Sequence, residues 1–132
     1  MDDKAMIQAI AEDKEWALEI PEEGVYLLSM PTTGDRSQSV YVVFKEDGDH
    51  HVALLWSHVG SASKFGDPWQ LLDYNWSHTY GALARRNGNE VVLKHTEIVD
   101  PGDESALAKA LEHVGKTADS IEQELYGELD LN

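Results

Sequence analysis

Residues 39–60 read SVYVVFKEDGDHHVALLWSHVG, and the architecture can be built from this stretch. Two runs of β-branched and aromatic residues, 39–46 and 51–60, flank the polar residues EDGD, which are typical of a tight turn. The pattern predicts a β-hairpin. Because both runs are almost continuously apolar, we expect at least part of each face of this hairpin to be covered.

The residues before the hairpin predict a helix and a first strand. Residues 3–13 have the apolar spacing of a short amphipathic helix. From residue 16 the apolar period changes to two, and residues 16–20 and 25–30 continue as a mostly apolar strand. The polar stretch 31–38 contains Pro and Gly and separates this strand from the hairpin. The result is a three-strand meander.

The residues after the hairpin predict a helix, a second hairpin and a long helix. Asp67 and Pro68 supply an N-cap and a first-turn proline for a short helix that ends near Trp76. Residues 80–86 and 90–99 flank an Asn-Gly pair, the strongest short hairpin signal. From Glu104 onward one helical stripe carries Leu107, Leu111, Val114, Ala118, Ile121 and Leu125.

The order of elements is therefore α-βββ-α-ββ-α. Every strand connection but one is short, so the sheet should be mainly antiparallel, with helices packed against it. The predicted fold class is α+β. With 132 residues, the chain fits a single domain over residues 1–132.

The net charge of −15 argues against binding to nucleic acid or an anionic membrane. The acids lie at the two ends. Residues 1–23 hold eight acids and two lysines, and residues 97–132 hold ten acids and two lysines, whereas residues 24–96 are nearly neutral. Two interpretations stay open: solvated helix faces, or steering of a basic or amphipathic partner.

The chain has no apolar run long enough to span a membrane. Its N-terminus carries acids where a signal peptide has a basic region. It also has no cysteine, which excludes disulfides, a thiolate zinc site and a cysteine nucleophile. We expect a cytoplasmic protein.

The tripeptide Trp-Ser-His occurs at 56–58 and at 76–78, which suggests a catalytic Ser–His pair or a repeat. The first copy lies in a predicted strand, where Ser57 and His58 project to opposite faces. The second copy ends a predicted helix, so the two copies differ in backbone geometry. Neither serine lies in a nucleophile elbow. We therefore predict neither a repeat nor a catalytic residue.

Six histidines raise the possibility of a metal site. His50 and His51 adjoin at the hairpin turn, close to Asp47 and Asp49, but the chain has no His-x₃-His or His-x-His spacing. It also has no dinucleotide-binding, P-loop or calcium-loop motif. We expect neither a metal nor a cofactor.

The features from residue 36 to the end resemble a family. LLDYN at 71–75, followed by YGALA at 80–84, and ADSIE at 118–122 carry most of the resemblance. The chain thereby resembles the YbjN-like proteins, which share the fold of class I type III secretion chaperones (the Tir-chaperone-like fold). The resemblance implies a small α+β protein that binds other proteins. In the chaperone branch it further implies a homodimer, formed largely through the second helix and neighbouring strands.

These observations predict a non-enzymatic, chaperone-like or regulatory module that binds a protein or peptide segment. Tyr41 and Trp56 on the central hairpin are the candidate partner-binding residues. The segment should be basic or amphipathic, because acidic helices would rim the site. The alternative is a small-molecule sensor or uncharacterised enzyme with a pocket between the sheet and the C-terminal helix. A dry apolar pocket with a few converging polar groups would favour that alternative, and a flat apolar patch would favour the module.

The predicted helix at 67–76 is apolar on two sides, whereas the core of one domain needs only one. A homodimer interface is therefore expected there. Its candidate residues are Trp69, Leu72 and Trp76 on one face and Leu71 and Tyr74 on the other.

Overall fold

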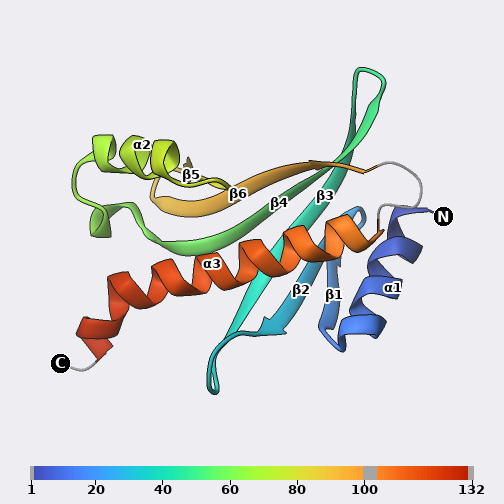
Figure 1. Ribbon diagram of the computed structural model, residues 1–132, viewed down its shortest axis with the longest axis horizontal. Helices are drawn as coiled ribbons and strands as arrows, with labels where there is room; N and C mark the ends of the chain where they lie inside the picture. Colours follow the sequence, from blue (N-terminus) through green and yellow to red (C-terminus); the bar gives the residue numbers. More distant parts are fainter. Residues whose placement is uncertain (1, 100–103, 131–132) are drawn as a thin grey trace.

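The computed structural model describes residues 2–99 and 104–130, with the backbone alone over residues 127–130. Its centre is a six-stranded antiparallel sheet in the order β1-β2-β3-β4-β6-β5 (Figure 1). The strands are β1 (Ala17–Glu22), β2 (Val25–Pro31), β3 (Ser37–Asp47), β4 (His50–Ser61), β5 (Ala82–Arg86) and β6 (Glu90–Ile98). The helices are α1 (Asp3–Lys14), α2 (Pro68–Ser77) and α3 (Glu104–Asp130), with a short 3₁₀ turn η1 (Ala62–Lys64). The predicted α+β class and antiparallel sheet are confirmed.

The meander contains four strands where the sequence predicted three. Residues 17–31 form the hairpin β1–β2 instead of one strand. Gly24 at its turn has a φ of +84°, a conformation that glycine adopts without steric cost. Pro21 has no backbone N–H to donate to a ladder, and it lies in β1 at the edge of the described sheet, where proline is tolerated.

Two local signals read from the sequence are confirmed. Asp67 caps α2, since its Oδ1 accepts a hydrogen bond from the backbone N–H of Trp69 at 3.0 Å, and Pro68 opens the helix. Asn87, Gly88 and Asn89 connect β5 to β6, and Asn87 and Gly88 have φ values of +53° and +82°. Gly and Asn are the residues that adopt this left-handed conformation most readily.

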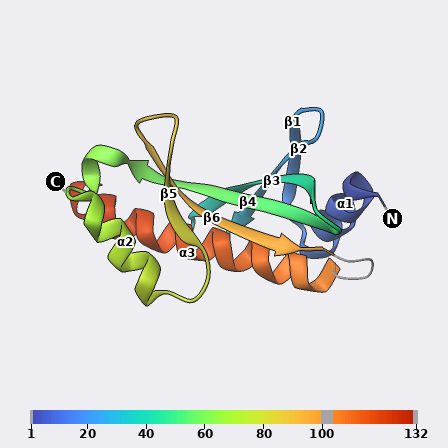
Figure 2. The same ribbon diagram turned by 90° about the horizontal axis from the view of Figure 1, so that it is seen from above.

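One face of the sheet, here called the inner face, is covered by α3 and α1. The 27-residue helix α3 runs along the sheet below β3, β4 and β6 (Figure 2). Its predicted apolar stripe is confirmed, because every member of the stripe from Leu107 to Ile121 is buried and Leu125 is half-buried. The core consists of this stripe, Met6, Ile7 and Ile10 of α1, and inner-face residues such as Leu28, Val40, Val42, Leu55 and Leu93.

Helix α3 lies so close to the sheet that glycine is needed at two contacts. A Cβ atom on Gly115 would lie 2.4 Å from Sδ of Met30, which is itself fully buried. A Cβ atom on Gly60 of β4 would lie 2.8 Å from the hydroxyl of Tyr126, which accepts a hydrogen bond from the N–H of Ser61 at 2.8 Å. These contacts fix α3 against two separate parts of the sheet.

An ion pair between the exposed Arg36 and the buried Asp119 holds the loop before β3 to α3. Nη2 and Nε of Arg36 each lie 3.0 Å from Oδ1 of Asp119, and Gln123 donates to Oδ2 at 2.9 Å. Burial alone would raise the pKa of Asp119, but the hydrogen bonds from Arg36 and Gln123 outweigh this effect, and the net pKa is lowered. The carboxylate is therefore held in its charged form.

Candidate protein-interaction surfaces

The face of the sheet opposite α3, here called the outer face, has no helix over it within the described ranges (Figure 2). Residues paired directly across antiparallel strands lie on the same face, so the strand register defines this surface. Its apolar members are Val25, Leu27, Tyr41, Val43, Val52, Leu54, Trp56, Val92 and Ile98. Val52 and Val92 are buried among their neighbours, Ile98 is 49% exposed, and the others are half-buried.

Tyr41 and Trp56, the predicted partner-binding residues, lie together at the centre of the outer face. They are directly paired between β3 and β4, and their rings stack with centroids 5.2 Å apart and planes 9° apart. The guanidinium carbon of Arg86 lies 5.3 Å from the centroid of the Trp56 ring, within cation–π range. The outer face therefore presents a half-exposed aromatic pair with a cation beside it.

Two lysines lie on the same face of the sheet as this aromatic pair. Lys94 of β6 is paired in register with Trp56, and Lys45 of β3 is paired with Val52. Both lysines are exposed, and neither forms an ion pair with any residue that the structure describes. Arg86, by contrast, lies 3.1 Å from a carboxylate oxygen of Glu90.

Acidic side chains enter the outer face mainly at its margin. Glu19 and Glu22 of β1 are paired with residues of β2 at the sheet edge. Glu90 at the other side already contacts Arg86 and lies 3.5 Å from Nδ1 of His58. Because α1 and α3 pack on the inner face, their described acids lie on the side of the sheet away from this aromatic pair. The charge of the partner stays a prediction.

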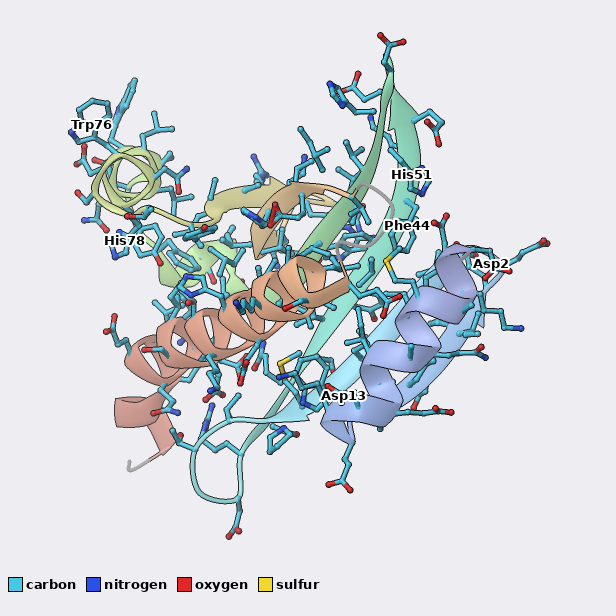
Figure 3. All side chains as sticks on the ribbon, turned by 45° about the vertical axis from the view of Figure 1, so that its right-hand side comes forward. Asp2, Asp13, Phe44, His51, Trp76 and His78 are labelled. Atoms are coloured by element: carbon cyan, nitrogen blue, oxygen red, sulfur yellow. The ribbon has the colours of Figure 1, made fainter. Side chains whose placement is uncertain are left out.

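Helix α2 forms a second unpaired surface. Trp69, Leu72 and Trp76 are 69%, 55% and 91% exposed, and Trp76 points away from the rest of the molecule (Figure 3). Leu71 and Tyr74, on the other side of the helix, are half-buried against the core. The two-sided character read from the sequence is thus present, and one side remains uncovered by the described chain.

Asn75 fixes the orientation of α2. Its side-chain amide donates to the carbonyl of Leu83 at 3.2 Å and accepts from the N–H of Leu83 at 2.7 Å. This two-point hydrogen bond ties the helix to β5. The exposed stripe of α2 is consequently held outward and cannot turn into the core without breaking both bonds.

The two Trp-Ser-His copies have different environments, as predicted. Ser57 is fully buried; its hydroxyl donates to the carbonyl of Ser39 at 2.6 Å and accepts from Gln38 at 2.9 Å. His58 projects to the other face. Ser77 donates back to the carbonyl of Asp73 in its own helix at 3.0 Å. Neither serine hydroxyl bonds to a histidine ring among the residues described.

His51 joins α1 to the central hairpin. Its Nε2 lies 2.7 Å from Asp3 and its Nδ1 lies 2.5 Å from Glu46, while its ring stacks on Phe44 (Figure 3). The hydrogen bond to Asp3, followed by that to Glu46, raises the pKa of His51. Within residues 2–99 and 104–126, no three His, Asp or Glu side chains gather in a metal-binding arrangement.

A pocket of about 350 Å³ lies between the sheet and α3. It is lined by Tyr80, Glu97, Ala106, Lys109, Ala110 and His113. The ring of Tyr80 lies between two imidazoles, with centroids 5.4 Å from His95 and 5.1 Å from His113. Four of the six lining side chains are polar or charged, so this is not the dry apolar pocket that would favour a small-molecule site.

No helix in the described part of the chain is both long enough and apolar enough to cross a membrane. The sequence matches no protein-family model, and no curated protein is significantly similar to it. The resemblance to YbjN-like proteins therefore stays a prediction, and the surfaces themselves carry the functional argument.

The sequence reasoning missed Lys45, Lys94 and Arg86 as part of the surface around the aromatic pair. The signal was available in part, because the period-two alternation of β6 puts Lys94 on the same face as Val92 and Ile98. Pairing of Lys94 with Trp56 depends on the register between β4 and β6, which local sequence does not specify.

Proposed function

We propose that this protein is a non-enzymatic, chaperone-like or regulatory module of the cytoplasm that holds a segment of another protein against its outer face. The observation that carries the proposal is the apolar outer face, which extends across four strands without a covering element in the described chain. Large contiguous apolar patches are rare on the surface of soluble proteins, and where they occur they often mark interaction sites.

The face is a better binding site than either edge of the sheet. The β1 edge contains Pro21 and a register shift between Glu19 and Glu22, and both features oppose the addition of a strand. The β5 edge is only five residues long. The resemblance to the YbjN-like and secretion-chaperone families supports the same kind of activity.

Within this proposal, the protein works as a homodimer whose interface includes the exposed stripe of α2. Trp69, Leu72 and Trp76 form a solvent-facing row on α2, and the other side of this helix already packs against the core. Large aromatic side chains at such positions are typical of the buried core of interfaces. This arrangement leaves the outer face available to a different partner.

A second candidate function is a small-molecule sensor or enzyme that uses the pocket between the sheet and α3. The observation in its favour is the convergence of Tyr80, His95 and His113 beside Glu97. We rank it below the binding module because its lining is mixed and open, whereas the outer face is broad and apolar.

Affinity capture from the source cells, followed by mass spectrometry, tests the two candidates together. Partners captured by the wild-type chain should be lost with the double variant Tyr41→Ala/Trp56→Ala. They should be retained with His113→Ala and with Thr96→Ala, an exposed polar position on the same outer face. Circular dichroism establishes that each variant is folded.

The non-enzymatic proposal would be contradicted by a histidine variant that loses biological activity but keeps its fold and its captured partners. The outer-face proposal would be contradicted if Tyr41→Ala/Trp56→Ala captured the same partners as the wild type.

A further inference from the structure

We infer that the segment held by the outer face is amphipathic and acidic, with apolar side chains over Tyr41 and Trp56 and Asp or Glu side chains at Lys45 and Lys94. The inference rests on the proposed function and adds the chemistry of its partner. It also reverses the sign of charge that the sequence alone suggested.

Lys45 and Lys94 have no ion pair among the described residues, although the chain has an excess of acids. The sequence has 25 Asp and Glu but only 10 Lys and Arg. Some cations do have an acidic partner, as Lys116 has in Glu112 at 3.0 Å and Arg36 has in Asp119. Lys45 and Lys94 have no such partner among the described residues. These two charges on the outer face are therefore available to a carboxylate of a partner.

The charge of Lys94 lies close to the aromatic ring of Trp56, on which an apolar side chain of the partner would pack. Lys94 is the direct cross-strand neighbour of Trp56, and adjacent strands lie about 4.8 Å apart. An apolar side chain seated on the Tyr41–Trp56 pair would therefore place the next residues of its segment within reach of the Lys94 ammonium group. A carboxylate there completes an ion pair that desolvation at an apolar surface would strengthen.

The acids of the outer face lie away from the aromatic pair, and one of them, Asp47, is paired with His50 near the tip of the β3–β4 hairpin. Glu90 is already engaged by Arg86 and faces His58, so it does not repel an incoming carboxylate as a free acid would. Glu19 and Glu22 lie on β1, two strands from Tyr41. A basic segment would be drawn to that edge and away from the aromatic pair, whereas an acidic segment would be drawn to the centre.

Single-stranded nucleic acid is the other anion that uses aromatic and basic side chains on a sheet. Two observations favour a peptide. The aliphatic residues Val43, Leu54 and Ile98 suit apolar side chains and cannot stack on bases. A net charge of −15 also repels a polyanion over its whole length, whereas an acidic peptide brings only a few charges, and repulsion beyond about 10 Å is screened at 0.1 M salt.

The test uses two synthetic fluorescein-labelled peptides of equal length, one alternating Leu with Glu and one alternating Leu with Lys, and measures anisotropy against the full chain. We expect the Leu/Glu peptide to bind about tenfold more tightly than the Leu/Lys peptide, and its affinity to fall with salt. Lys45→Glu/Lys94→Glu should reverse this order. Lys4→Glu/Lys109→Glu makes the same change in net charge at exposed positions on the helices and should leave the order unchanged.

The other possible results distinguish an error in the inferred charge of the segment from an error in the proposed binding face. Tighter binding of the Leu/Lys peptide, with loss on Tyr41→Ala/Trp56→Ala, would overturn the inferred charge and keep the proposed function. Binding of the Leu/Glu peptide that survives Tyr41→Ala/Trp56→Ala would overturn the outer face as the site. Tighter binding of a single-stranded DNA oligonucleotide would also overturn the inference. So would the absence of binding of either peptide at 100 µM, a concentration that corresponds to about 5.5 kcal/mol of binding free energy.

Discussion

His51 and Asp119 each hold a helix or loop to the rest of the molecule through an ion pair. His51 is half-buried, and the carboxylate of Asp119 is buried. His51 joins α1 to the β3–β4 hairpin, and Asp119 of α3 receives the loop that carries Arg36. Their pKa values move in opposite directions from their ordinary values. Stability should therefore depend on pH through both residues, with opposite signs.

At His51, the pKa is raised in the folded state, first by the hydrogen bond to Asp3. The stabilisation is fully present below the unfolded-state pKa of about 6.5 and is lost as pH rises through the folded-state pKa. His51→Gln should lower the melting temperature by a few degrees at pH 6 and by less at pH 9. Thermal unfolding at several pH values checks this. His50→Gln, at the exposed neighbouring position, should show no such trend.

At Asp119, the pKa is lowered in the folded state, because the hydrogen bonds from Arg36 and Gln123 outweigh the opposing effect of burial. The stabilisation is present above the unfolded-state pKa of about 3.9 and is lost as pH falls through the folded-state pKa. Asp119→Asn should cost about 1–3 kcal/mol at pH 7, with a difference from wild type that shrinks on acidification.

Urea unfolding at pH 7 and in acid measures this difference. The matched control is Glu122→Gln, because Glu122 lies 3.7 Å from the same guanidinium but is more exposed. Its effect should stay within about 0.5 kcal/mol. An equal loss in the two variants would show that the buried carboxylate has no special role.

Among the elements, α2 has ends and apolar sides that can be predicted from the sequence and an orientation that cannot. Its cap at Asp67, its first-turn proline and its two apolar sides could all be read in advance, because they depend on residues within the helix. Which side faces solvent could not, because that depends on the hydrogen bonds between Asn75 and Leu83 of another element. The same limit applies to Lys94, whose position beside Trp56 is set by strand register.

The strand count shows a different limit. Residues 17–31 are apolar enough to resemble one strand, and only the two residues Glu23 and Gly24 divide them into two strands. Likewise, β6 inserts between β4 and β5, an order that short connections alone do not determine. Element types could thus be predicted well, whereas pairing partners and faces required the three-dimensional arrangement.

The exposed side of α2 leads to a prediction about assembly. We expect a homodimer in solution that depends on Trp69, Leu72 and Trp76, because an isologous contact buries the same stripe twice. Light scattering at high micromolar concentration should give twice the mass of the chain. Trp69→Ala/Trp76→Ala should shift the mass to that of a monomer, whereas Gln70→Ala, exposed on the same helix, should not. A wild-type monomer at these concentrations would contradict the prediction.

For the molecule as a whole, charge and apolar surface are divided between the two sides of the sheet. The acidic helices α1 and α3 pack on the inner face, and the aromatic pair with its lysines lies on the outer face. A count of charges along the sequence could not show this division. It assigned both acidic segments to helices, whereas Glu19 and Glu22 lie in β1. It also did not place the helices relative to the aromatic residues.

The stability of the whole molecule should not depend on a metal ion. The core is apolar and continuous over the described residues, and His51 uses both ring nitrogens in contacts with carboxylates. We expect the melting temperature in excess EDTA to stay within a few degrees of its value in buffer. A larger drop, restored by one added divalent metal, would reveal a structural site.

The covering of the inner face by α3 has a consequence for synthesis on the ribosome. The strands β1 to β4 emerge consecutively and pair locally, but α3 follows all six strands in the chain. Until it emerges, the nascent sheet exposes its outer face and the part of its inner face that α1 does not cover. Contacts between distant parts of a sequence form late, and partly covered sheets aggregate readily. A chain that stalls before Glu104 should therefore itself become a substrate for general chaperones, and the finished protein would keep only one of its two apolar faces open.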